Sequence, residues 1–253
     1  MATTLEVLFA PAEFAALTER DLSQTICVVF DVFRATTTIV TALANGAAEV
    51  IPVAEIADAL AIRRRRPEVL LAGEREGHRI RAEQTGGTDF DLGNSPREFI
   101  PARISGKTIV LSTTNGSRAL RACARAQAVA AGSFLNLRAT AQYLERHPAS
   151  RLLLVCSGTG NEAAYEDILG AGALVELISG RLASEKFADS AQVALQIYRQ
   201  NSSDLLGAVS HSRNGRRLMS IADLRDDVPR CLQRDIYPLV AKLDGDAITK
   251  LIP

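Results

Sequence analysis

Residues 28–38 read VVFDVFRATTT. The apolar, β-branched start of this stretch is typical of a buried strand, and the strand carries Asp31 at its carboxyl end. The threonines that follow favour a helix start, where hydroxyls and free backbone amides can bind an anion. Because ligands gather at the carboxyl ends of strands in open α/β sheets, the stretch predicts a strand, a ligand-binding turn and a helix in succession.

The same alternation continues through the first two thirds of the chain. Strands are predicted at Leu5–Phe9, Thr25–Phe30, Glu49–Val53, Val69–Leu71, Thr108–Leu111, Ala126–Ala131 and Leu152–Cys156. Helices are predicted at Thr36–Asn45, Ile56–Arg66, Gly116–Arg125 and Leu137–Arg146. This alternation is typical of an α/β fold with a largely parallel sheet. Asp31–Val53 and Ser112–Ala131 repeat one order of turn, helix and strand, which predicts two structurally similar halves.

The last third of the chain is mostly helical in pattern. Helices are predicted at Ala163–Ile178, Phe187–Tyr198, Ser203–Val209 and Asp223–Asp235, and strands at Leu239–Leu243 and Ala247–Leu251. We expect these helices to cover the sheet. The predicted division is an N-terminal α/β half, residues 1–103, and a C-terminal α/β half with its helical cover, residues 104–253, working as one functional unit.

Composition narrows the class of partner. The 253 residues include 47% hydrophobic residues, enough for a sizeable core, and the 29 basic and 29 acidic residues cancel. A neutral chain has no general attraction to nucleic acid or to an anionic membrane. No leader pattern or membrane-spanning run is seen, so we expect a cytoplasmic protein that binds a small molecule, with a homo-oligomer left open.

Several familiar sites do not fit. Cys27, Cys123, Cys156 and Cys231 lack the close pairs of a zinc site and are expected to be buried thiols. The turn after Cys156 lacks the arginine of a phosphatase cysteine loop. A haloacid-dehalogenase site would need a second aspartate where Phe33 stands, and the glycines after Cys156 are only a weak dinucleotide signal.

Five turns carry the candidate chemistry. They are Asp31–Thr38, Gly73–Arg75, Phe90–Pro96, Thr113–Arg118 and Ser157–Asp167. Their carboxylates suit a hard cation such as Mg²⁺, which combines a few carboxylates with water and phosphate oxygens. The only histidines are His78, His147 and His211, too few and too scattered to support a zinc or iron centre.

The same residues resemble one known family. The matching motifs are VxDVxRATTT at 29–38, GER at 73–75, DLGNSP at 91–96, TTNG at 113–116, and CSG at 156–158 followed by Glu166-Asp167. Together they resemble the 2-phosphosulfolactate phosphatase family over nearly the whole chain. The resemblance implies a three-layer α/β/α fold of two similar halves. It also implies a magnesium-dependent hydrolysis of 2-phospho-3-sulfolactate to 3-sulfolactate and phosphate, a step in coenzyme M biosynthesis.

On this basis we assign expected roles to the turn residues. The expected catalytic residues are Asp31, Arg34, Glu74 and Asp91. The expected metal ligands are Asp31, Glu74, Asp91, Glu166 and Asp167. The expected substrate-binding residues are Arg34, Thr36, Thr37, Arg75, Asn94, Thr114, Asn115, Arg118 and Ser157.

Three alternatives stay open. Asp31 can be a metal ligand or a nucleophile, so direct attack by water and a phospho-aspartyl intermediate are both compatible with the sequence. The substrate can be another small phosphorylated hydroxy acid. A non-catalytic anion sensor is the third possibility, although clustered carboxylates would repel an anion unless a cation offsets their charge.

Overall fold

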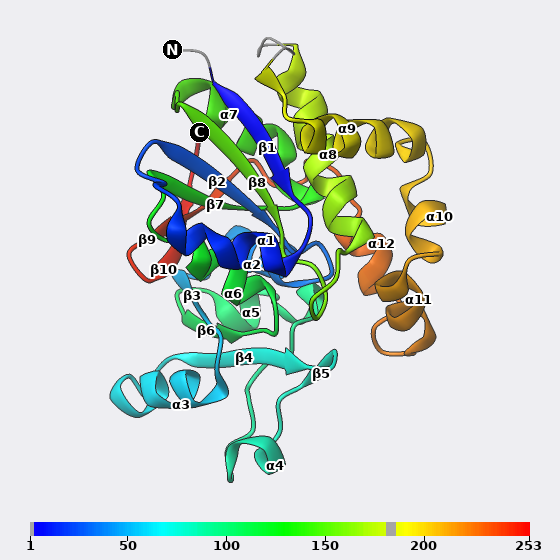
Figure 1. Cartoon of the computed structure of the whole chain (residues 1–253). Coiled ribbons are helices and arrows are strands. Elements are labelled where there is room, and N and C mark those ends of the chain that lie inside the picture. Colours follow the sequence, from blue (N-terminus) through cyan, green and yellow to red (C-terminus); the bar gives the residue numbers. More distant parts are fainter. Residues whose placement is uncertain (1–2, 181–185) are drawn as a thin grey trace.

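The computed structural model describes residues 3–180 and 186–253, and these form an α/β fold. The strands are β1 (Thr4–Leu8), β2 (Thr25–Phe30), β3 (Glu49–Val53), β4 (Leu70–Arg75), β5 (His78–Arg79), β6 (Thr108–Ser112), β7 (Ala128–Gly132), β8 (Arg151–Cys156), β9 (Val240–Asp244) and β10 (Ala247–Leu251). They pair in the order β1-β8-β2-β7-β9-β10-β3-β6-β4-β5 (Figure 1).

Helices lie on both sides of this sheet. They are α1 (Pro11–Ala15), α2 (Ala35–Ala44), α3 (Ile56–Arg65), α4 (Ala82–Thr85), α5 (Pro101–Ile104), α6 (Gly116–Ala122), α7 (Leu137–Arg146), α8 (Tyr165–Ser179), α9 (Asp189–Asn201), α10 (Leu205–Ser210), α11 (Arg213–Ser220) and α12 (Asp227–Cys231). In these residues, no helix is long and apolar enough to cross a membrane.

The sheet consists of two parallel groups joined by a hairpin. Strands β1, β8, β2 and β7 are parallel to one another, and so are β3, β6 and β4. The β9–β10 hairpin is antiparallel to both neighbours, so the two groups run in opposite directions. In a flat sheet, their carboxyl ends would therefore lie at opposite edges.

The sheet avoids that separation by curling around α2 and α6. A single core cluster contains Val29 of β2 and Leu111 of β6, one from each parallel group, together with Ile39 of α2 and Leu120 of α6. Strand β4 lies in the lower part of the view in Figure 1, well below β1 and β8. Its carboxyl end is on the side of the molecule where α11 lies. The carboxyl ends of β2, β4, β6 and β8 consequently meet in one region of the molecule.

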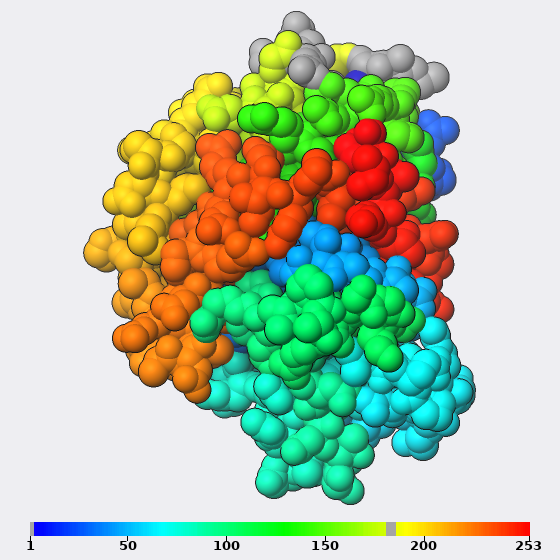
Figure 2. Space-filling view, turned by 180° about the vertical axis from the view of Figure 1, so that it is seen from behind, coloured from blue at the N-terminus to red at the C-terminus, as the bar shows by residue number. Residues whose placement is uncertain are grey.

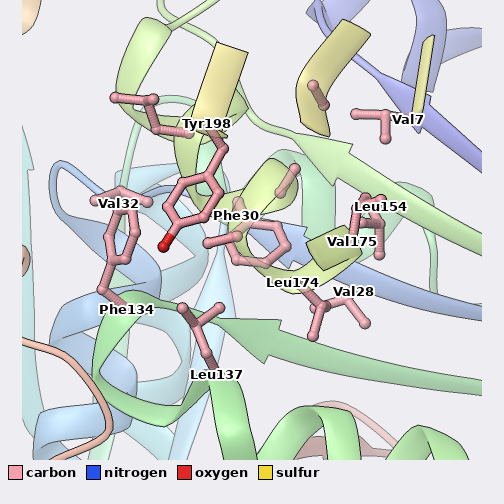
Figure 3. Packing of buried hydrophobic residues seen from close by; sticks show 14 of the residues in the cluster. Val7, Val28, Phe30, Val32, Phe134, Leu137, Leu154, Leu174, Val175 and Tyr198 are labelled. Carbon is pink, nitrogen blue, oxygen red and sulfur yellow. The ribbon is translucent and has the colours of Figure 1, made fainter. Parts of the chain in front are cut away.

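The other face of the sheet packs against the C-terminal helices. Successive residues of a strand point to opposite faces, and in β2 the side chains of Val28 and Phe30 turn away from α2. They pack with Leu174 of α8 and Tyr198 of α9 (Figure 3). This arrangement of helices, sheet and helices is the expected three-layer α/β/α architecture, and the expected helical cover is confirmed.

The predicted strands, including the two at the C-terminus, are confirmed within a few residues of their ends. The sequence analysis did not anticipate α1, α4, α5, β5 and α11, which are short or lack a clear apolar pattern. The division at residue 103 stays a prediction. Each parallel group takes strands from both sides of that position, and the C-terminal hairpin lies between the groups.

Candidate active site

A cavity of about 260 Å³ opens where the strand ends meet. The predicted site residues that line it are Asp31, Arg34, Glu74, Asn94, Thr114 and Asn115. They come from the turns after β2 and β6, from the carboxyl end of β4 and from the loop before η2 (Pro96–Glu98). The meeting of distant turns on this cavity makes it the candidate active site.

Asp31 is the buried carboxylate of the cavity. Its Oδ1 accepts a hydrogen bond of 3.0 Å from the backbone N–H of Ala35, in the first turn of α2. Thr36 fixes the backbone on either side, because its Oγ1 accepts from the Asp31 N–H and donates to the Asp31 carbonyl, both at 3.0 Å. Burial raises the pKa of Asp31 to about 6, and the charge of Glu74 acts in the same direction.

Gly116 lets α6 approach this carboxylate. A Cβ atom at position 116 would lie only 2.5 Å from Asp31 Oδ2, so any other residue would displace the carboxylate or the helix. The glycine of the TTNG turn therefore permits the close approach of α6 to Asp31.

Glu74 ties two turns together. Its Oε1 accepts hydrogen bonds from the backbone N–H and the Oγ1 of Thr114, at 3.2 and 3.1 Å. Its Oε2 accepts from the Gly77 N–H at 2.7 Å. The carboxylate thus holds the β4–β5 turn against the turn after β6 while it lines the cavity.

The buried Asp167 carboxylate already accepts hydrogen bonds from its neighbours. Its Oδ1 accepts from the Val32 N–H at 2.7 Å, and its Oδ2 accepts from Ser157 Oγ and from the Gly158 N–H, both at 3.1 Å. Burial raises its pKa well above the usual carboxyl range. Asp167 therefore joins the turns after β2 and β8 and positions Ser157.

Several buried oxygen atoms at the site have no hydrogen-bond partner in the part of the chain that the structure describes. They are Asn94 Oδ1, Asn115 Oδ1 and Glu166 Oε2. The amide orientation of Asn115 is set by its nitrogen, which donates to the carbonyls of Ser157 and Gly160 at 3.0 and 3.2 Å. Buried acceptors without donors are costly, and a bound cation would satisfy them.

The oxygen atoms of the cavity fit Mg²⁺ better than they fit a metal ion whose ligands all come from the protein. Among the described residues, no cluster of three or more His, Cys, Asp or Glu side chains could hold a metal ion. Mg²⁺ does not need one, because it commonly takes one or two carboxylates and fills its other positions with water and substrate phosphate. Asp31 and Glu74, with the amide oxygens of Asn94 and Asn115, meet that requirement.

The structure does not bring every predicted residue to the cavity. Asp91 forms an ion pair with Arg63 and accepts from the Leu71 N–H at 2.7 Å, away from the lining. Arg75 binds the Ala54 carbonyl and Ser112 Oγ, both at 3.0 Å.

Further predicted residues lie outside the lining as well, namely Thr36, Thr37, Arg118, Ser157, Glu166 and Asp167. Thr37 donates to the Val32 carbonyl at 2.9 Å and so stabilises its turn. Arg118 is exposed on α6 and faces solvent.

Other site residues were missed by the sequence analysis. Asp227 is fully buried and accepts from Arg34 at 2.7 Å and from Ser95 at 2.6 Å. Asn214 and Arg217 of α11 line the cavity. Figure 2 shows the segment around α11 and α12, in orange, against a green segment from the middle of the chain. Only this tertiary contact brings them to the site, and no local motif marked them.

The metal-free protein is expected to become less stable as the pH rises from about 5 to about 7.5. Burial raises the pKa of Asp31 to about 6 and also raises the pKa of Glu166 and of Asp167. The folded state therefore holds more protons than the unfolded state in this window, so the free energy of unfolding falls with increasing pH. Urea unfolding at both pH values measures this change. In Glu166→Gln, the free energy of unfolding should depend less steeply on pH. A free energy of unfolding that increases over the window would contradict the assignment.

Comparison with known proteins identifies the family. Residues 13–246 match the family model described as 2-phosphosulpholactate phosphatase. A protein of Thermotoga petrophila is 40% identical over 227 residues, which cover 89% of this chain and 92% of the relative. A protein of Pseudothermotoga lettingae is 36% identical over 250 residues, which cover 98% of this chain and 100% of the relative. Both relatives bear the name "Probable 2-phosphosulfolactate phosphatase".

The fold and these matches define the class of the protein, a phosphoric monoester hydrolase. Since the family model covers most of its length, the chain belongs to the 2-phosphosulfolactate phosphatase family.

Proposed function

We propose that this protein hydrolyses 2-phospho-3-sulfolactate to 3-sulfolactate and phosphate with the help of Mg²⁺. The observation that carries the proposal is the cavity itself, which Asp31 and Glu74 line together with Asn94 and Asn115, whose buried amide oxygens have no hydrogen-bond partner among the described residues. The substrate is a small, highly anionic phosphoester. Its phosphate needs a counter-charge beside the carboxylates, because carboxylates alone would repel it.

In the proposed reaction, Asp31 accepts a proton from the water molecule that attacks phosphorus. Its pKa of about 6 makes the carboxylate the prevailing form at neutral pH, while it remains basic enough to accept a proton from water. Oδ1 is held by the Ala35 N–H, which fixes the orientation of the carboxylate. Attack by Asp31 itself on phosphorus would instead displace 3-sulfolactate and form an acyl phosphate, which water then breaks. After a single turnover in water labelled with ¹⁸O, label in Asp31 would establish the acyl phosphate route, whereas label in phosphate is expected from direct attack and also from attack of water on the phosphorus of an acyl phosphate.

The other groups of the cavity bind and orient. Mg²⁺, held by Asp31, Glu74 and the amide oxygens of Asn94 and Asn115, would supply positive charge to the phosphate oxygens when bound. Arg34 is 3% exposed and is held by Asp227 and by the Gly77 carbonyl, each at 2.7 Å. Its guanidinium is thereby fixed at the cavity wall, where it can donate further N–H groups to a phosphate oxygen.

The first test is phosphate release from racemic 2-phospho-3-sulfolactate and a panel of other phosphorylated hydroxy acids. Release should be strongest on the sulfonated compound, should stop with a chelator, and should return when Mg²⁺ is added in excess. Mg²⁺ should also raise the free energy of unfolding at neutral pH, because it binds the folded state. Chelator-resistant release would contradict the metal role, and release strongest on another panel member would change the substrate.

A further inference from the structure

Helix α11 forms part of the cavity wall and is anchored on both sides. Asn214 donates to Thr159 Oγ1 at 2.7 Å and also to Glu166, which connects α11 to the segment after β8. Arg217, three residues later, donates to the Glu76 carbonyl in the β4–β5 turn. Residues three and four apart share a helix face, and Asn214, Arg217 and Leu218 all line the cavity.

Arg217 is the lining cation whose charge is not neutralised by a carboxylate. The charged residues that line the cavity are Asp31, Glu74, Glu76, Arg34 and Arg217. The Arg34 guanidinium is ion-paired with Asp227 at 2.7 Å. In residues 3–180 and 186–253, Arg217 forms no ion pair, and its guanidinium donates a hydrogen bond to a neutral carbonyl, that of Glu76. Its charge is therefore available to a ligand.

The chemistry of Arg217 suits a second oxyanion on the substrate. One N–H of its guanidinium is used by the Glu76 carbonyl, and an arginine carries five N–H donors in a planar fork. That fork matches the paired oxygens of a sulfonate or a carboxylate. The side chain is exposed, and Leu218 on the same helix face gives it an apolar neighbour at the cavity.

A neighbouring cavity of about 470 Å³ is a weaker place for this anion. It is lined by several arginines, but carboxylates already balance them. Arg79 pairs with Glu98 at 2.7 Å, and Arg97 pairs with Asp227 at 2.8 Å. A ligand anion there would have to displace partners that the protein already supplies, whereas Arg217 has no such partner among the described residues.

We propose that Arg217 binds the sulfonate of the substrate and so determines specificity for phosphorylated hydroxy acids that carry a second strong anion. The inference rests on the proposed phosphatase function. The phosphate would lie over Asp31 and Glu74, and the sulfonate would point outward to α11. Arg217 contacts substrate in this arrangement but takes no part in breaking the phosphoester bond.

The test compares two substrates that differ in one group. 2-Phospho-3-sulfolactate and 2-phospholactate share the phosphate and the carboxylate, but the second has a methyl group where the first has a sulfomethyl group. Arg217→Ala should lower kcat/KM on the sulfonated substrate by about 10- to 100-fold, mainly through KM, and should leave kcat/KM on 2-phospholactate nearly unchanged. Arg217→Lys should restore part of the loss, because it keeps the charge but not the fork.

Arg216→Ala is the matched control. Arg216 lies on the same helix, is exposed, and donates to the His211 carbonyl outside the cavity lining. Its removal should leave the ratio between the two substrates unchanged. Equal losses on both substrates in Arg217→Ala would make Arg217 a structural residue and overturn the inference.

Failure of the proposed function is distinguishable from failure of this inference. If the wild-type protein hydrolyses neither substrate, calorimetric binding of 3-sulfolactate still reports on Arg217. Weaker binding in Arg217→Ala than in Arg216→Ala would support the role of Arg217. Equal affinity in the two variants, or no binding by the wild-type protein, would overturn it.

Discussion

Asp31→Asn is expected to lower kcat by about 10³- to 10⁴-fold while the protein stays folded. The amide keeps an oxygen for the Ala35 N–H but can neither accept a proton from water nor attack phosphorus. Since burial raises the pKa of the native carboxyl to about 6, replacing it with a neutral group should not destabilise the fold at neutral pH. Phosphate release under saturating substrate and Mg²⁺ measures the effect.

The control for Asp31→Asn is a stability measurement on the same preparation. The urea midpoint at neutral pH should equal or exceed that of the wild-type protein. A variant with near-normal turnover would contradict the role of Asp31, whereas lost turnover with a much lower midpoint would point to misfolding rather than to chemistry.

Asp227→Ala is expected to lower the free energy of unfolding by about 3–5 kcal/mol. The Asp227 side chain is 0% exposed and the paired Arg34 side chain is 3% exposed. Removing the carboxylate leaves a buried guanidinium without its counter-charge and also leaves Ser95 Oγ without its acceptor. Urea unfolding at constant pH measures the change.

Asp226→Ala is the matched control for Asp227→Ala. The Asp226 side chain is 65% exposed and lies 3.6 Å from Arg97 and 4.0 Å from Arg225. Exposed ion pairs of this kind contribute at most about 1 kcal/mol. Equal losses in the two variants would contradict the claim that the buried pair stabilises the wall of the cavity.

Much of the fold could be predicted because each element has a local cause. The run Thr25–Phe30 is apolar and β-branched, and the strand β2 has those same bounds. The alternation of strands and helices likewise indicated the α/β class. The curl of the sheet around α2 and α6 could not be predicted, since it depends on a hairpin at the far end of the chain pairing between the two parallel groups.

The candidate site could likewise be predicted from the sequence only in part. Asp31 and Glu74 were found because each follows an apolar strand in a polar turn, and both line the cavity. Asp91 also lies in a polar turn that was singled out from the sequence, yet its carboxylate pairs with Arg63. Sequence cannot separate these cases, because the side to which a turn directs its carboxylate is set by the neighbouring strands and helices.

Arg217 and Asp227 could not be predicted from their local sequence. Neither follows a strand, and each reaches the cavity or its wall through contacts with residues more than a hundred positions away. Long-range packing is therefore what completes the site around the turns that the sequence marks.

The contrast between Glu74 and Asp91 tests the central claim, that catalysis takes place in this cavity. The measurement is kcat/KM for phosphate release from 2-phospho-3-sulfolactate, with Mg²⁺, in Glu74→Gln and Asp91→Asn. We predict a loss of about 100-fold in Glu74→Gln and a value close to wild type in Asp91→Asn. The reverse order, or equal losses in two variants that remain folded, would contradict the claim.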